Sequence, residues 1–106
     1  MKEQVREILD ELLPHLRAIY GARLKRTVLF GSQARGDAEP ESDIDVLVVL
    51  EGPVNPCHEI DRCVGITADL SLKHTVVIST AYVSEDRYIS ERSPFLMNVR
   101  REGVTL

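Results

Sequence analysis

The sequence predicts a small α/β (α+β) domain in which helices pack on one mixed β-sheet. Helix-like and strand-like segments follow one another in the order α-β-(short α)-β-α-β-α-α, which is typical of such a domain. The second strand segment is apolar on both faces after its first residues, as in a central strand that is covered on both sides. A chain of 106 residues has room for one modest core, so residues 1–106 are expected to form a single domain.

The first helix is expected over residues 2–20, where apolar residues recur at helical spacing. Pro14 lies inside this pattern and predicts a kink or a break, because proline removes a backbone hydrogen bond and clashes with the preceding turn. Gly21 is the expected end of the helix. Thr27–Phe30 then predicts a short buried strand that ends at Gly31.

The middle of the chain predicts a second strand, a helix and a third strand. Ser32 is expected to cap a short helix, residues 36–42 form a loop of turn-forming residues, and residues 43–50 form the second strand. After a loop at 51–56, helical spacing covers about 58–72. Thr75–Ser79 is the expected third strand.

Two helices are expected at the end of the chain. Ser84 is followed by acidic residues and is typical of a helix N-cap. Ser93 and Pro94 are a cap followed by a proline at the first helical position, and Gly103 is expected to end this last helix.

The composition excludes several classes of protein. No run approaches the roughly 20 apolar residues that a membrane helix needs, and the polar N-terminus is unlike a secretion signal, so a cytoplasmic location is expected. A net charge of −4 disfavours direct nucleic-acid binding. Cys57 and Cys63 are expected to be reduced thiols in or near the core, with a disulfide or metal pair as the alternative.

The most informative residues are a Gly-Ser turn and a pair of acids. Gly31 and Ser32 follow the first strand, where close backbone approach, free N–H groups and a hydroxyl suit a phosphate. Asp43 and Asp45 are spaced i, i+2 on a strand and project from one face. Magnesium binds through one or two carboxylates together with substrate phosphates, so the set predicts a site for a metal-bound nucleoside triphosphate.

Phe30–Gly36 and Ser42–Asp45 together resemble the signature of the DNA polymerase β nucleotidyltransferase superfamily, and in particular its minimal nucleotidyltransferase (MNT) domains. The resemblance covers essentially the whole chain and implies a polymerase β-type nucleotidyltransferase fold. It implies Mg²⁺ or Mn²⁺ as the cofactor and an NTP, with ATP favoured, as the substrate.

The resemblance also implies roles for individual residues. Gly31, Ser32, Arg35 and Ser42 are the expected nucleotide-binding residues. Asp43 and Asp45 are the expected catalytic and metal-binding carboxylates. A nucleotidyl group, AMP, would move to a hydroxyl while pyrophosphate leaves.

The sequence departs from the family pattern at one place. Active members generally carry a third carboxylate on the next strand, yet the expected strand holds no acid, and Val76 or its neighbour occupies the position. Asp69 is the nearest acid that could substitute as a metal ligand, although it falls on the preceding helix. The chain is therefore either a transferase or a catalytically weak or inactive nucleotide-binding module.

Similarity to MNT proteins further implies a protein partner. Such proteins commonly pair with a small helical HEPN protein, and the pair forms a toxin–antitoxin system in which the MNT member neutralises the toxin. Neutralisation could come from AMP transfer to a hydroxyl of the partner or from direct contact. A homo-oligomer is also compatible with the sequence, and an antibiotic-modifying transferase is disfavoured because the acceptor-binding domain is absent.

Overall fold

A four-stranded mixed sheet forms the middle layer of the computed structural model, which describes residues 1–40 and 42–106. Residue 41, in the predicted loop, lies outside the described residues. In chain order the elements are α1 Glu3–Tyr20, the 3₁₀ turn η1 Gly21–Arg23, β1 Leu24–Phe30, α2 Ser32–Arg35, β2 Ile44–Leu50, α3 Pro56–His74, β3 Ile78–Ser84, α4 Glu85–Ser90, α5 Pro94–Glu102 and β4 Val104–Thr105.

The order of the strands in the sheet is β3-β2-β1-β4. Strand β1 runs antiparallel to both β2 and β4, whereas β2 and β3 are parallel and are joined by the α3 crossover. The predicted mixed sheet is thus confirmed, and β2 is one of its two inner strands.

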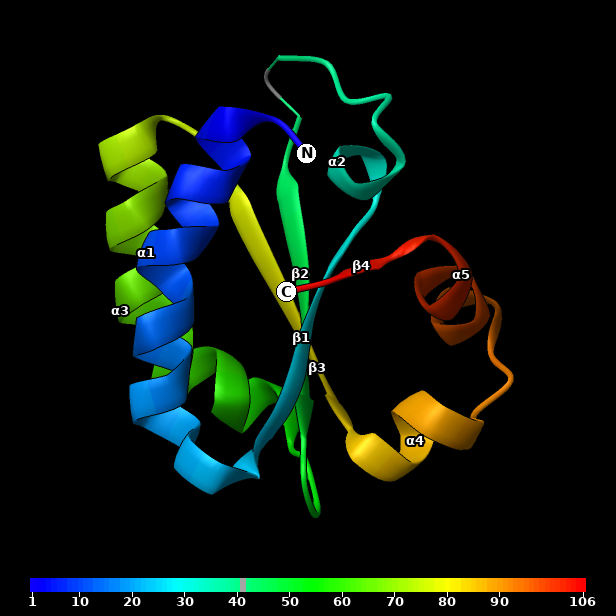
Figure 1. Ribbon diagram of the computed structural model, residues 1–106. Helices are drawn as coiled ribbons and strands as arrows, with labels where there is room; N and C mark the ends of the chain where they lie inside the picture. The colour runs from blue at the N-terminus through cyan, green and yellow to red at the C-terminus, as the bar shows by residue number, and fades with distance from the viewer. Residues whose placement is uncertain (41) are drawn as a thin grey trace.

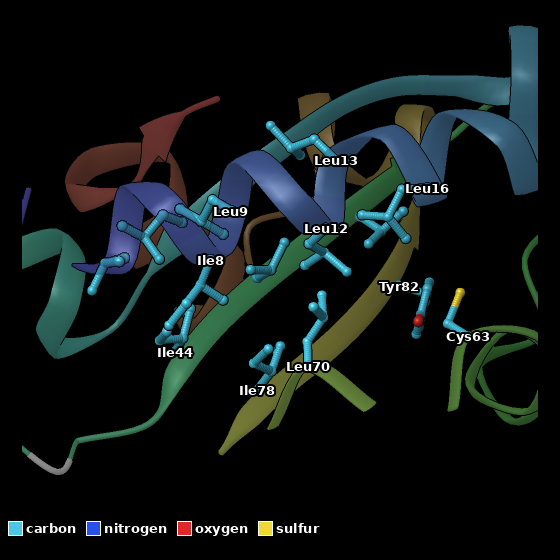
Figure 2. Packing of buried hydrophobic residues seen from close by; sticks show 14 of the residues in the cluster. Ile8, Leu9, Leu12, Leu13, Leu16, Ile44, Cys63, Leu70, Ile78 and Tyr82 are labelled. Carbon is cyan, nitrogen blue, oxygen red and sulfur yellow. The ribbon is translucent and has the colours of Figure 1, made fainter. Parts of the chain in front are cut away.

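Helices cover both faces of the sheet. Helices α1 and α3 lie on one face, and α4 and α5 lie on the other (Figure 1). Strand β2 alternates between two cores: Val46 and Val48 pack with α1 and α3, whereas Leu47 and Val49 pack with α4 and α5. The larger core is shown in Figure 2, where leucine and isoleucine side chains of α1 gather over β2 and β3. Burial on both faces explains why β2 reads as a continuous apolar run.

The prediction at Pro14 was a kink or a break, and the break is wrong because helix α1 continues through Pro14. Pro14 is exposed, while Leu12, Leu13 and Leu16 around it are buried. Packing of this apolar stripe against the sheet holds the helix together across the missing hydrogen bond. The predicted end at Gly21 is confirmed: it is the C-cap, with a φ of 54°, and its N–H donates to the carbonyl of Arg17.

The third strand is displaced from its predicted position at Thr75–Ser79. Helix α3 runs to His74, and Thr75 caps it with a left-handed φ of 53°. The hydroxyl of Ser71 then accepts a hydrogen bond from the N–H of Ile78 at 3.2 Å, which is where β3 begins. The residues between serve as a turn, and the strand continues to Ser84.

The C-terminal helices agree with their predicted caps. The hydroxyl of Ser84 accepts from Arg87 N–H at the start of α4, and that of Ser93 accepts from Leu96 N–H at the start of α5. Strand β4, which the sequence did not predict, follows Gly103 and pairs with β1.

The two cysteines are free, and only Cys63 is buried. Within the described part of the chain no helix is long and apolar enough to cross a membrane.

Candidate functional site

The Gly-Ser turn and the acid pair come together because β1 and β2 are antiparallel. The end of β1 therefore meets the start of β2, and Phe30 lies opposite Asp45 in the register. Asp45 alternates with Ile44 and Val46, which pack with α1 and α3. Its carboxylate consequently lies on the other face of the sheet, the one that α5 covers.

The Asp45 carboxylate lies close to the backbone of Gly31. A Cβ atom at position 31 would lie 2.5 Å from Asp45 Oδ2, which is closer than any real contact. The backbone of Gly31 also has a φ of 74° and a ψ of −158°, a region that is essentially restricted to glycine. Glycine is thus required at this position both for the turn and for the close approach of the acid.

Helix α2 is a single turn that is stabilised by backbone hydrogen bonds to Gly31 and by a side-chain hydrogen bond to the loop before β2. The carbonyl of Gly31 accepts hydrogen bonds from the N–H groups of Ala34 and Arg35, each at 3.1 Å. The buried amide of Gln33 donates to the carbonyl of Ser42 at 3.3 Å, which ties α2 to the entrance of β2. Ser42 is therefore brought beside the turn through its backbone. The N–H groups of Ser32 and Gln33 lie in the first turn of α2, where the helix offers no preceding carbonyl to accept their hydrogen bonds.

The two carboxylates lie in different environments, and the charge of Asp43 acts on Asp45. Asp43 is exposed and Asp45 is half-buried. Burial raises the pKa of the Asp45 carboxyl, and the negative charge of Asp43 raises it further, while the positive charge of Arg35 opposes both. Two acids that disfavour each other's charge are suited to a cation placed between them. The donor set therefore fits Mg²⁺ with two protein ligands and further oxygens from phosphate and water.

Arg35 lies at the edge of this site. Its Nε donates to Asp37 Oδ2 at 3.2 Å, and its Nη1 lies 3.7 Å from Glu102 Oε2 of α5. The guanidinium thus connects α2 to α5 while remaining close enough to Asp45 to act on its pKa.

The structure does not bring Asp69 to the site. It is an exposed residue of α3, which packs on the opposite face of the sheet from Asp45. The residue beside Asp45 on β3 is Ser79, and Ala81 follows on the same face. The expectation that Val76 occupies this position is wrong, because β3 begins after the turn. Among the described residues, no group of three or more His, Cys, Asp and Glu side chains could hold a metal.

A pocket that the sequence did not reveal adjoins the turn. It has a volume of about 160 Å³. One side is lined by Phe30, Gly31 and Arg35, and the other by the α5 residues Phe95, Asn98, Val99 and Glu102. These α5 residues follow helical spacing, but nothing in the sequence indicated which face of α5 would meet Gly31.

Known proteins with similar sequences are described as nucleotidyltransferases or adenylyltransferases. A family model for the nucleotidyltransferase domain matches residues 2–95. A Methanocaldococcus jannaschii protein called "Putative protein adenylyltransferase" is 39% identical over 99 residues, covering 92% of this chain and 93% of that one. A second protein of the same name and organism is 36% identical over 76 residues, covering 72% and 76% of the two chains.

Solved structures with the same fold include one described as "Structure of putative minimal nucleotidyltransferase". It has a TM-score of 0.62 and 27% identity, and the match covers 98% of this chain and 94% of that one. A crystal structure of a toxin-antitoxin with AMP-PNP has a TM-score of 0.58 at 17% identity, covering 96% and 68% of the chains. At that identity the likeness shows the fold alone.

Proposed function

The chain belongs to the nucleotidyltransferase domain family, and from this premise we propose that it transfers AMP from ATP to a hydroxyl group of a partner protein in a Mg²⁺-dependent reaction. The single observation that carries the proposal is the contact between Gly31 and the Asp45 carboxylate. It makes the phosphate-binding turn and the acid pair one site.

Each residue of the site has a role in this proposal. The backbone and hydroxyl of Ser32, together with the first N–H groups of α2, bind phosphate oxygens, and Arg35 adds a positive charge. Asp43 and Asp45 hold the metal. When bound, Mg²⁺ neutralises phosphate charge and polarises the phosphoryl group. The acceptor oxygen bonds to the α-phosphorus and its hydroxyl proton passes to water, while the bond from that phosphorus to the bridging oxygen breaks and pyrophosphate leaves.

The proposed acceptor is a helical protein of the HEPN type, in the cytoplasm. Two relatives carry the description protein adenylyltransferase, and one neighbour in fold comes from a toxin-antitoxin structure. The description of the two relatives supports a protein as the acceptor. Our proposal is that this chain modifies its partner as the antitoxin of such a pair.

Transfer of label from α-labelled ATP to the partner in the presence of Mg²⁺ tests the proposal. Asp43→Asn and Asp45→Asn should each abolish transfer. Asp69→Asn is the matched control and should leave it unchanged, because Asp69 lies on the opposite face of the sheet. Absence of label transfer by the unmodified protein would refute the enzymatic proposal.

A second candidate function is neutralisation of the partner by direct contact, with weak or no transfer. Ser79 favours it, because this residue stands beside Asp45 where active relatives of the superfamily are expected to carry an acid. The contact function predicts that a double variant, Asp43→Asn with Asp45→Asn, still neutralises the partner. It also predicts that Ser79→Asp raises the rate of transfer, whereas Ser79→Asn does not.

Thermal unfolding tests nucleotide binding apart from transfer. Mg-ATP at 100 times its Kd should stabilise the fold by about 2.7 kcal/mol, and the effect should weaken when EDTA removes the metal. A melting temperature that does not respond to Mg-ATP would argue against the transfer function and would leave neutralisation by direct contact as the remaining candidate.

A further inference from the structure

The binding of phosphate and metal proposed above uses no residue of α5, although α5 forms one wall of the pocket beside the Gly-Ser turn. Its α5 wall includes Phe95, Asn98 and Glu102, which are spaced i, i+3 and i+7 and therefore share one face of the helix; the buried Val99 completes this wall. The Arg35–Glu102 ion pair joins α2 to α5, and the two helices lie near one another in Figure 1. The opposite wall contains Gly31 and Arg35, so the pocket is continuous with the phosphate-binding turn.

Phe95 is a partly exposed aromatic residue in the first turn of α5. Its side chain is 46% exposed, although neighbouring residues of α5 on the core side, Leu96 and Val99, are buried. It makes an edge-to-face contact with Phe30, with 5.3 Å between the ring centroids. An exposed aromatic ring held by a second ring is a stable platform for stacking.

Asn98 adds a polar group one helical turn further along the same face. Its Oδ1 accepts a hydrogen bond from Arg101 at 2.9 Å, which orients the amide. A carbonyl oxygen has a second lone pair, and the NH₂ group offers two donors. An asparagine amide can thus pair with adenine by accepting from the N6 amino group and donating to N7.

We propose that this pocket is the base subsite of the nucleotide site and that it selects adenine, with Phe95 stacking on the base and Asn98 hydrogen-bonding its edge. The inference rests on the proposed function, because the triphosphate must lie at the Gly31–Ser32 turn for the base to reach the pocket. A volume of about 160 Å³ is well below that of a drug-sized cavity and suits a single nucleobase.

Arg35 and Glu102, which both line the pocket, form an ion pair with 3.7 Å between Nη1 and Oε2. Arg35 thus belongs to both the phosphate and the base parts of the site.

Calorimetric titration with ATP, GTP and inorganic tripolyphosphate, each with Mg²⁺, separates the subsite from the rest of the site. The unmodified protein should bind ATP more tightly than GTP or tripolyphosphate. Phe95→Leu keeps an apolar contact with Phe30 but removes the aromatic face. It should weaken ATP binding by about 5- to 150-fold and leave tripolyphosphate binding unchanged.

Asn98→Ala should reduce the preference for ATP over GTP by about 5- to 150-fold. Met97→Ala is the matched control, since Met97 is an exposed residue of the same helix that does not line the pocket. It should change neither affinity. Circular dichroism and melting temperatures establish that each variant is folded.

The outcomes distinguish the two proposals. If the unmodified protein binds ATP and tripolyphosphate equally well, or if Phe95→Leu and Asn98→Ala bind ATP as the unmodified protein does, the base subsite is refuted while the proposed function stands. If neither ATP nor tripolyphosphate binds, both proposals fail.

Discussion

At the scale of single residues, two glycines flank α2 and have different reasons to be glycine. Gly31 and Gly36 both have positive φ values, 74° and 82°. A Cβ at Gly36 would meet nothing within 4 Å, whereas one at Gly31 would collide with Asp45 Oδ2. Only Gly31 therefore links backbone conformation to the position of a functional group.

This difference predicts distinct effects of Gly31→Ala and Gly36→Ala. Each should lower the free energy of unfolding by about 1–3 kcal/mol through backbone strain. Only Gly31→Ala should also weaken Mg-ATP binding, because the Asp45 carboxylate must rotate away from the new methyl group. Urea unfolding and calorimetric titration measure the two effects. Equal Mg-ATP affinities in the two variants would contradict the role given to Gly31.

Glu91 predicts a pH dependence of stability at the junction of α4 and α5. Arg87 donates to both of its carboxylate oxygens, at 2.9 and 3.0 Å, and the Ser93 hydroxyl donates to one of them. The hydrogen bonds from Arg87 and then Ser93 lower the pKa of Glu91. The stabilisation is therefore complete above the pKa of the unfolded chain, about 4.3, and is lost as the pH falls through the lower folded value.

Melting temperatures of Glu91→Gln and the unmodified protein should accordingly differ at pH 7 and converge as the pH falls below about 4. Because Arg87 is the main cause of the shift, this pH-dependent difference should shrink in an Arg87→Gln background. A difference that persists unchanged at low pH would rule out this ion pair as its source.

At the scale of elements, the packing of α1 against the sheet outweighs the helix-breaking tendency of its Pro14. Proline at position 14 lacks the N–H that would donate to the carbonyl of Asp10, and yet the helix is continuous from Glu3 to Tyr20. Its buried stripe, which includes Leu12 and Leu16, contributes to the larger core and compensates for the defect.

Replacement of the exposed Pro14 by alanine should thus stabilise the protein. The gain in free energy of unfolding should be as much as about 3 kcal/mol, because alanine restores the hydrogen bond and is the best helix former. Ala18→Gly, at an exposed position of the same helix, is the control and should cost about 1 kcal/mol. A Pro14→Ala protein that melts no higher than the original would show that α1 has adapted fully to its proline.

At the scale of the whole molecule, β4 closes the edge of the sheet beside the site. Thr105 and Val104 lie opposite Val28 and Leu29 in the register, and the N–H of Leu106 donates to the carbonyl of Thr27 at 2.9 Å. Strand β1, which leads into the Gly-Ser turn, is thereby an inner strand with partners on both edges.

Deletion of residues 104–106 should uncover that edge of β1. The expected result is a lower melting temperature and aggregation that increases with protein concentration, since an unpaired strand edge is a template for pairing between chains. Val104→Thr keeps the backbone pairing and should aggregate no more than the unmodified protein. Light scattering during heating measures the aggregation of the two variants. A truncated protein that stays monomeric would contradict the proposed role of β4.

Much of the fold could be predicted from signals that act over a few residues. These signals include the apolar spacing of α1, the serine caps at positions 84 and 93 and the glycine at position 21. Each depends only on residues within one or two helical turns. The third strand was misplaced because Thr75–Val77 has a β-like composition but must turn the chain after α3. Strand β4 was missed because two residues carry no periodic pattern.

The sequence by itself determined that a Gly-Ser turn follows one strand and that two acids begin the next on one face. Only the tertiary structure decided that Asp45 rests against Gly31, that Asp69 lies across the sheet, that Ser79 stands beside Asp45, and that α5 forms a pocket at the turn. The physical reason is the range of the interactions. Periodicity and capping depend on adjacent residues, whereas strand order, the choice of face and the position of a helix over a sheet arise from contacts between residues far apart in the chain.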